Sequence, residues 1–285
     1  MPTVAIISKP QKPEVAPILG EIILWMRAHG FETILDPVSG NYTQDAQVVP
    51  RQEMVAHNPE LAIVLGGDGT LLAAARVFAK HNVPILSVNL GSLGFLTEVR
   101  LADLFANLEA WSRDECTVDA RAMLHVELER DGDTFRSYEA LNDIVVAKGA
   151  IARMGDFEIF SSDQLAAAFR ADGVIISTPT GSTAYSLAAN GPIVSPDVDA
   201  VLVTPICPHL LTIRPIVLRG DARITIGVVG VPDQTFLTVD GQEAVQVRLG
   251  DRIRACRSEH RVRLVRMRKD GFFDVLRQKL KWGER

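Results

Sequence analysis

Hydrophobic positions in the first part of the chain follow two alternating patterns. Strands are predicted at 4–8, 31–35, 61–65 and 84–88, and the uninterrupted apolar run at 61–65 is typical of a strand buried on both faces of a sheet. Apolar residues with helical spacing occur at 14–29, where Gly30 suits the helix end, after residue 70, and at 101–111. Strands that alternate with helices predict a doubly wound, parallel α/β domain, which we place at residues 1–115. The polar segment 36–59 predicts an irregular crossover.

The pattern changes after residue 115. Residues 117–129 alternate between polar and apolar, Asp131, Gly132 and Asp133 supply a hairpin turn, and 134–148 are the predicted return strand. Short β runs broken by Gly and Pro follow at 158–161, 173–177, 201–204, 223–229, 236–239, 244–247 and 261–265. We therefore expect a β-rich domain at 116–268. A helix at 272–282, within a C-terminal segment 269–285, is predicted to pack back on the first domain.

Length and composition restrict the class of protein. A chain of 285 residues with 47% hydrophobic and 23% charged residues fits a globular protein of two domains. Apolar runs are too short for a membrane span, and the N-terminus lacks the features of a signal peptide, so we expect a cytoplasmic protein without a membrane partner. A net charge of −5 argues against general nucleic-acid binding. Three scattered cysteines support neither a disulfide framework nor a zinc site.

The first candidate site is the turn Gly66-Gly67-Asp68-Gly69-Thr70, which follows the apolar run at 61–65. Strand, glycine turn and helix form the place where an α/β sheet presents backbone N–H groups to a ligand. The glycines permit close backbone approach and a positive φ, and Asp68 is the only acid of the turn. A plain βα turn with Asp68 as a helix cap is the alternative interpretation. A second glycine loop, residues 89–95, follows the run at 84–88.

The second candidate site lies within residues 172–192. Six serine and threonine side chains fall among the ten residues 177–186, after a buried strand. Gly181 provides a turn, and Ser182 or Thr183 is expected to cap a short helix at 184–189. Hydroxyls and N–H groups suit an anionic or hydroxyl-rich ligand, and Tyr185 offers a face for stacking a planar ring. An ordinary capped turn explains one or two of these residues but not their coincidence.

These motifs carry a resemblance to known kinases. The motif at 66–70 is shared by NAD kinases, 6-phosphofructokinases and diacylglycerol-type lipid kinases. Four further segments resemble NAD kinases specifically: Asn142-Asp143 in its apolar context, Thr178 to Ser186, Cys207-Pro208-His209, and Val239-Asp240-Gly241-Gln242. The resemblance covers residue 4 to about residue 273, and the enterobacterial type of bacterial enzyme is the most similar. It implies transfer of the γ-phosphoryl group of ATP to the 2′-hydroxyl of the adenosine ribose of NAD, and a dinucleotide-binding role for the β-rich domain at 116–268.

Taken without the resemblance, the residues of the two motifs also favour phosphoryl transfer. The sequence has neither a P-loop motif nor a complete Rossmann fingerprint. Gly67 and Gly69 can present N–H groups to phosphates, and Asp68 is the candidate general base, a role worth about 10²–10⁴-fold in rate. No cluster of three carboxylates suggests a protein-built metal site, so we predict no metal ligands and expect Mg²⁺ or another divalent ion to arrive with ATP.

Asn142 and Asp143 are candidates for holding ribose hydroxyls or form an ordinary turn; many relatives carry Glu in place of Asp143. Asp172 either binds substrate or starts a strand, and Asp240 and Gly241 are expected to form a hairpin turn. The predicted substrate-binding residues are Gly67, Gly69, Asn142, Asp143, Arg153, Arg170, Asp172, Thr183, Ala184, Tyr185, Ser186, Leu187, Ala188 and Gln242.

The resemblance adds three expectations. It implies a homodimer or homotetramer, and it places Arg153 and Arg170 near the dinucleotide phosphates, with Arg153 reaching from a neighbouring subunit. Within the family a charged residue at the position of Arg170 accompanies dependence on ATP, whereas a small residue accompanies use of inorganic polyphosphate. Two alternatives stay open: a lipid kinase that shares the motif at 66–70, and a dinucleotide sensor without turnover.

Overall fold

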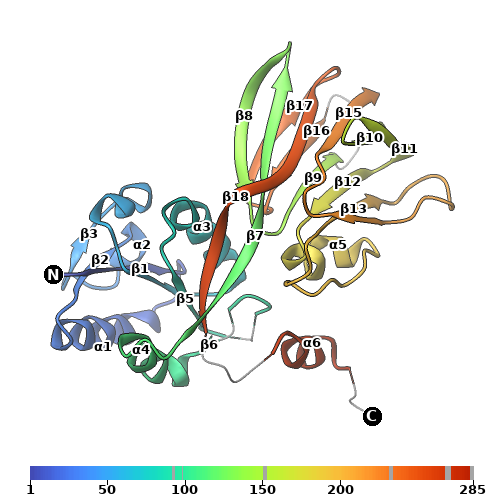
Figure 1. Ribbon diagram of the computed structural model, residues 1–285. Coiled ribbons are helices and arrows are strands. Elements are labelled where there is room, and N and C mark those ends of the chain that lie inside the picture. Colours follow the sequence, from blue (N-terminus) through green and yellow to red (C-terminus); the bar gives the residue numbers. More distant parts are fainter. Residues whose placement is uncertain (92–93, 98, 150–152, 231–233, 267–270, 283–285) are drawn as a thin grey trace. The chain divides into compact units, whose positions relative to one another are not determined.

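The chain divides into two compact units (Figure 1). The computed structural model describes residues 1–91, 94–97, 99–149, 153–230, 234–266 and 271–282. Unit 1 comprises Met1–Ala120 and Arg261–Arg285, and unit 2 comprises Arg121–His260. Unit 1 is therefore built from two separate segments of the chain. Strands β7 (Thr117–Arg130) and β18 (Arg252–Arg266) each begin in one unit and end in the other. The predicted domain limits at 115/116 and 268/269 stay predictions.

Unit 1 is built on a parallel sheet with the strand order β3-β2-β1-β4-β5. Leu264 of β18 continues the sheet beyond β5, and the short strand β6 pairs with the end of β5. The order reverses between β1 and β4, whose carboxyl ends are therefore neighbours at the topological switch point. The strands are β1 (Thr3–Ser8), β2 (Glu32–Leu35), β3 (Gln47–Val48), β4 (Leu61–Leu65), β5 (Ile85–Asn89) and β6 (Val99–Arg100).

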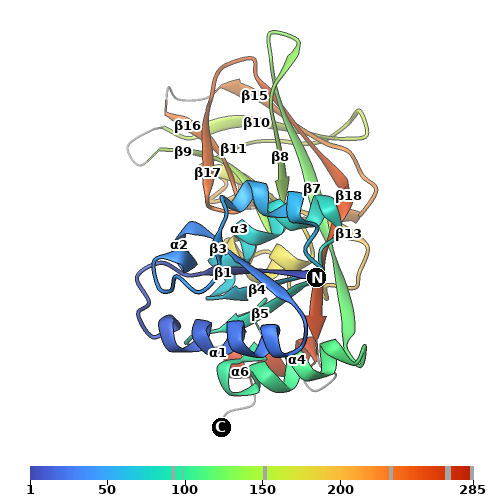
Figure 2. The ribbon, with the colours of Figure 1, turned by 90° about the vertical axis from the view of Figure 1, so that its left-hand side faces the viewer.

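Helices cover both faces of this sheet, as Figure 2 shows. α1 (Val15–Ala28) and α4 (Leu104–Ser112) share one apolar cluster with the sheet, and α3 (Asp68–Phe78) lies on the opposite face. The predicted doubly wound architecture is therefore confirmed. The crossover expected to be irregular contains α2 (Pro37–Gly40), β3 and a 3₁₀ segment (Arg51–His57), and α6 (Phe272–Leu280) is the C-terminal helix. Among the described residues, every helix is too short or too polar to cross a membrane.

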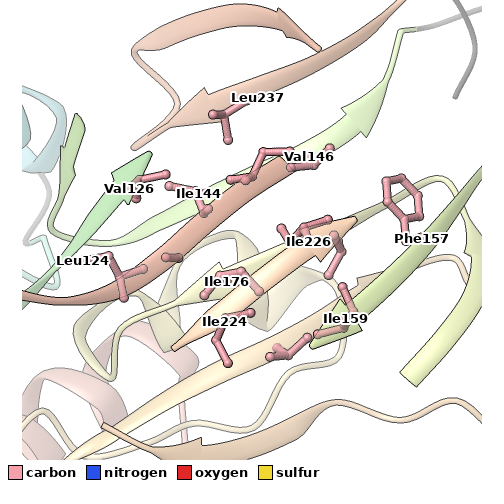
Figure 3. Packing of buried hydrophobic residues seen from close by; sticks show 14 of the residues in the cluster. Leu124, Val126, Ile144, Val146, Phe157, Ile159, Ile176, Ile224, Ile226 and Leu237 are labelled. Atoms are coloured by element: carbon pink, nitrogen blue, oxygen red, sulfur yellow. The ribbon is translucent and has the colours of Figure 1, made fainter. Parts of the chain in front are cut away.

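Unit 2 consists of two β-sheets with an apolar core. Figure 3 shows side chains of both sheets in this core, among them Val126, Ile159 and Ile226 from one and Ile144 and Ile176 from the other. One sheet contains β11 (Gln164–Ala171), β10 (Gly155–Ser161), β15 (Ile224–Gly230), β18, β7 and β8 (Asp133–Ala140). The other contains β14 (Ile216–Arg219), β13 (Ala200–Ile206), β12 (Gly173–Ser177), β9 (Asp143–Lys148), β16 (Thr235–Val239) and β17 (Glu243–Val247). The predicted β-rich second domain is confirmed.

One strand prediction was wrong, one was too short, and two strands of unit 2 were missed. The single return strand at 134–148 is divided, because the chain leaves β8 at Leu141 and Asn142 and enters the other sheet as β9. The strand predicted at 261–265 is confirmed, but it is only the end of the longer β18. Strands β11 and β14 were missed: most β11 side chains are exposed, so it lacks a buried apolar face, and four-residue β14 is too short to show a clear alternation.

Candidate functional site

The glycine turn of unit 1 lies between β4 and α3, at the switch point of the parallel sheet. A Cβ atom on Gly66 would lie 2.5 Å from Thr70 Oγ1, so the turn packs too closely for any side chain there. A Cβ atom on Gly67 would meet nothing within 4 Å, which leaves its backbone facing open space. None of Gly66, Gly67 and Gly69 adopts the positive φ that glycine permits. Glycine serves here to leave room beside the backbone.

Asp68 is the first residue of α3, and its carboxylate bonds to a different part of the chain. Oδ2 accepts the backbone N–H of Phe95 at 3.0 Å. Oδ1 accepts the N–H of Leu96 at 3.2 Å, the N–H of Thr97 at 3.0 Å and the hydroxyl of Thr97 at 3.0 Å. A negative charge in the first helical turn also interacts favourably with the helix dipole. The side chain of Asp68 therefore joins the turn after β4 to the loop after β5, and the interpretation as a simple helix cap was wrong.

The loop that receives Asp68 is anchored to β5. Ser87 Oγ donates to the carbonyl oxygen of Leu96 at 3.1 Å, and Asn89 Nδ2 donates to Thr97 Oγ1 at 3.1 Å. A Cβ atom on Gly94 would lie 2.1 Å from Asp68 Oδ1, so this backbone presses directly against the carboxylate. Asn89 and Thr97 were not among the predicted site residues, although the second glycine loop after the strand at 84–88 was a signal for this region.

In unit 2, Leu141 and Asn142 form the turn where the chain changes sheets, and Asp143 begins β9. Asp240 accepts three consecutive backbone N–H groups, those of Leu141 at 3.0 Å, Asn142 at 2.8 Å and Asp143 at 3.2 Å. On the carbonyl side, the N–H of Thr178 donates to the oxygen of Asn142 at 2.9 Å. The backbone of the turn is thus fixed from two directions, while the Asn142 residue stays partly exposed.

Asp240 and Gly241 adopt positive φ values of 49° and 63° between β16 and β17, which confirms the predicted hairpin turn. The contact of Asp240 with the Asn142 turn was not predicted.

Asp143 is 4% exposed, and its carboxyl group accepts a hydrogen bond from the backbone N–H of Tyr185. Burial raises the pKa of Asp143 from 3.8 to about 7, the negative charge of Asp240 adds to this, and the Tyr185 N–H opposes it. Near neutral pH the group is therefore present in both forms. Such a carboxyl group can accept or donate a hydrogen bond to a hydroxyl group of a ligand.

The hydroxyl-rich loop forms a 3₁₀ turn, Thr180–Thr183, and the single-turn helix α5 (Tyr185–Ala188). The predicted cap was wrong, since Ala184 precedes α5 and no side chain caps it. Ser182 Oγ instead accepts the N–H of Val194 at 3.0 Å. Ser186 Oγ is buried and 2.8 Å from Thr204 Oγ1, so both hydroxyls stabilise the fold.

Tyr185 is 47% exposed and thus accessible for stacking. Among its neighbours, Ala188 is exposed and Thr183, Ala184 and Leu187 are partly exposed.

The remaining predicted binding residues lie on the surface of their units. Arg170 on β11 makes a two-pronged ion pair with Asp156, with distances of 2.9 and 3.2 Å, which raises the pKa of its guanidinium. Asp172 Oδ1 lies 2.9 Å from Lys148 Nζ. The exposed residues Gly69, Arg153 and Gln242 complete the set. Their roles in binding stay predictions.

Within the described ranges, no group of three or more His, Cys, Asp or Glu side chains is placed to hold a metal ion. Both oxygens of the Asp68 carboxylate are also engaged by the 94–97 loop.

Comparison with known proteins decides the family. Residues 4–116 match the model of the ATP-NAD kinase N-terminal domain, and residues 141–267 match that of the ATP-NAD kinase C-terminal domain. The chain belongs to the ATP-NAD kinase family. Its fold and its enzyme class, a phosphotransferase, are therefore those predicted. The match over 141–267 decides against the lipid-kinase alternative, whereas the enterobacterial subgroup stays a prediction.

Individual relatives agree with this assignment. A protein of Acidobacterium capsulatum named NAD kinase is 62% identical over 285 residues, which cover 100% of both chains. Yeast NADH kinase, solved in complex with NADH, is 28% identical with a TM-score of 0.92, covering 100% of this chain and 89% of that one. An NAD kinase from Archaeoglobus fulgidus, solved in complex with ATP, shares the fold with a TM-score of 0.77 at 23% identity and 98% coverage of both chains.

Proposed function

We propose that this kinase-family chain transfers the γ-phosphoryl group of ATP to the 2′-hydroxyl of the adenosine ribose of NAD, giving NADP and ADP. The observation that carries the proposal is the placement of Asp68. The Asp68 carboxylate stands at the switch point of a parallel sheet, next to a glycine backbone that leaves open space. Asp68 takes the proton of the attacking hydroxyl, a contribution of about 10²–10⁴-fold in rate.

Backbone groups and side chains of the predicted set bind the substrates. The N–H groups of Gly67 and Gly69 at the N-terminus of α3 stabilise phosphate charge. Asn142 and Asp143 bind ribose hydroxyls. Hydrogen bonds with Asp240 and Thr178 hold the backbone of this segment in position for that role. The exposed ring of Tyr185 stacks on a planar part of the dinucleotide. Arg153, Arg170, Asp172 and Gln242, with the exposed atoms of residues 183–188, complete the binding surface.

The divalent ion enters as part of the ATP complex. Phosphoryl transfer depends on positioning and on neutralising the charge of the phosphate oxygens, and a magnesium ion held by those oxygens supplies much of the neutralisation. The chain contributes the base and the orientation of the acceptor hydroxyl. We also propose that the enzyme works in the cytoplasm as a homodimer or homotetramer, in which Arg153 reaches the dinucleotide of a neighbouring subunit.

The test is incubation of the protein with NAD, ATP and magnesium, followed by detection of NADP with an NADP-specific dehydrogenase. We expect NADP formation by the wild-type chain. Asp68→Asn is expected to lose about 10²-fold or more in turnover while retaining NAD binding measured by calorimetry. Dinucleotide binding without turnover in the wild-type protein identifies a sensor, and near-normal turnover of Asp68→Asn removes Asp68 from the mechanism.

A further inference from the structure

The two oxygens of the Asp68 carboxylate have different surroundings. An ionised carboxylate offers about two acceptor sites on each oxygen. Oδ1 already receives three donors, the N–H groups of Leu96 and Thr97 and the Thr97 hydroxyl. From the described part of the chain, Oδ2 receives one donor, the N–H of Phe95. Oδ1 is therefore fully occupied, and Oδ2 retains room for one more hydrogen bond.

A chain of side-chain hydrogen bonds fixes this difference. A threonine hydroxyl has one proton to donate, and Thr97 Oγ1 lies 3.0 Å from Asp68 Oδ1 and 3.1 Å from Asn89 Nδ2. The amide of Asn89 can only donate through Nδ2, so the hydroxyl must accept from Asn89 and give its own proton to Asp68. Asn89 is itself oriented, because its Oδ1 accepts the N–H of Gly91 at 2.6 Å. Thr97 is fully buried and Asn89 is 7% exposed, so the hydrogen bonds from Asn89 to Thr97 and from Thr97 to Asp68 are shielded from water.

We propose that Thr97 and Asn89 are positioning residues that hold Asp68 so that Oδ2 is the oxygen that accepts the proton. The proposal rests on the proposed kinase function. As the 2′-oxygen of NAD forms its bond to the γ-phosphorus of ATP, the hydroxyl proton passes to Oδ2. The bond between the γ-phosphorus and the bridging oxygen breaks, and its electron pair leaves with ADP. Thr97 and Asn89 touch neither substrate in this scheme, and they act through the orientation and charge of Asp68.

Thr97→Val tests the proposal because it removes the hydroxyl with little change in shape. We expect kcat to fall by roughly 10- to 100-fold, the effect of losing one hydrogen bond to a charged group, with the KM values for NAD and ATP nearly unchanged. A donor to a carboxylate favours its charged form, so the acid limb of the kcat–pH profile should move to higher pH without that donor. Thr97→Ser keeps the hydroxyl and should restore most of kcat and the wild-type limb.

Two further variants separate positioning from general support of the loop. Asn89→Ala removes the donor that orients the Thr97 hydroxyl, so it should lower kcat when introduced alone. In a protein that already carries Thr97→Val, it should cause little further loss of kcat. Ser87→Ala is the matched control on the same strand. It removes the 3.1 Å hydrogen bond from Ser87 to the Leu96 carbonyl oxygen and keeps the hydrogen bonds that join Asn89, Thr97 and Asp68. It should leave kcat and the acid limb near wild type.

Each outcome decides the proposal. A folded Thr97→Val protein with wild-type kcat and pH profile overturns it, and so does a loss of activity that Ser87→Ala reproduces without a shift of the acid limb. If the thermal unfolding midpoint shows that Thr97→Val does not fold, the proposal stands or falls on whether Asn89→Ala lowers kcat more than Ser87→Ala does. A wild-type protein that makes no NADP overturns the function and the positioning role together. An inactive Asp68→Asn beside a normal Thr97→Val overturns the positioning role alone.

Discussion

Asp240 Oδ1 accepts the backbone N–H of Asn142 at 2.8 Å, across a sequence separation of 98 residues. The same carboxylate takes the N–H groups of Leu141 and Asp143, so one side chain binds the whole turn at which the chain passes from β8 to β9. Asp240 is 7% exposed and sits in a tight turn with positive φ. The position of the proposed ribose-binding residues therefore depends on a hairpin distant in the sequence.

Asp240→Asn should destabilise this turn. An amide places an NH₂ group where one carboxylate oxygen stood, which leaves at least one backbone N–H without an acceptor, and we expect a loss of about 1–3 kcal/mol in the free energy of unfolding. Affinity for NAD should fall as well, because the Asn142 turn loosens. Urea unfolding and calorimetry measure the two effects. Asp221→Asn, in an exposed ion pair with Arg219, is the control and should change neither value appreciably.

The pKa of Asp143 predicts a pH dependence of stability. Burial raises this pKa to about 7 in the folded protein, from the ordinary value of 3.8 that applies in the unfolded chain. Between these values the folded state holds a proton that the unfolded chain has released. The free energy of unfolding should therefore fall as pH rises, by up to about 1.4 kcal/mol per pH unit, and become level above pH 7.

Asp143→Asn removes this contribution. Comparing urea unfolding of both proteins between pH 5 and pH 8 isolates it, and equal slopes for the two proteins would contradict the assignment.

The half-exposed ring of Tyr185 predicts an effect on binding without an effect on folding. Tyr185→Ala should weaken NAD binding by about 1–3 kcal/mol, by analogy with base–aromatic stacking. Tyr185→Phe keeps the ring and should bind nearly as the wild type does. Calorimetry measures the affinities, and thermal unfolding checks stability. Equal NAD affinity of the Ala variant and the wild type would exclude stacking.

A side chain at position 94 should reduce both the stability and the turnover of the enzyme. In Gly94→Ala the new Cβ atom would lie 2.1 Å from Asp68 Oδ1 and 2.3 Å from Thr97 Oγ1, so the loop must move. We expect a loss of about 1–3 kcal/mol in unfolding free energy and a large loss of turnover. Gly20→Ala in α1 is the opposite case, with no atom within 4 Å of the new Cβ. It should stabilise the helix by about 0.5–1 kcal/mol and leave activity unchanged, which thermal unfolding and the NADP assay can check.

The charged side chain of Arg170 leads to a prediction about the phosphoryl donor. Its guanidinium donates two hydrogen bonds to Asp156, and a planar fork can select one arrangement of phosphate oxygens. We expect ATP as donor with little activity on inorganic polyphosphate. Arg170→Gly should raise the ratio of polyphosphate to ATP activity, and Arg219→Gly, which removes another exposed arginine paired with an aspartate, should not. Efficient polyphosphate use by the wild-type protein would contradict the donor assignment and leave the kinase function intact.

Much of unit 1 was predictable because its signals are local. The run at 61–65 is buried at every position, and such a run indicates a central parallel strand before any contact is known. The glycine turn after it, with Asp68 as its only acid, follows from the same short stretch. The hairpin at Asp240 and Gly241 was predictable too, since turn residues between two β runs define it.

What the sequence could not provide are contacts between distant segments. β character continues through residues 134–148, and only the bonds from Leu141, Asn142 and Asp143 to Asp240 show why the chain turns there into another sheet. The acidic residue Asp68 was evident in the sequence, whereas the engagement of its Oδ1 by Thr97, 29 residues later, depends on the pairing of β4 with β5. Periodicity reports how a segment is buried. The hydrogen bonds that orient a carboxylate depend on which loops the paired strands bring together, and that is decided only in the folded chain.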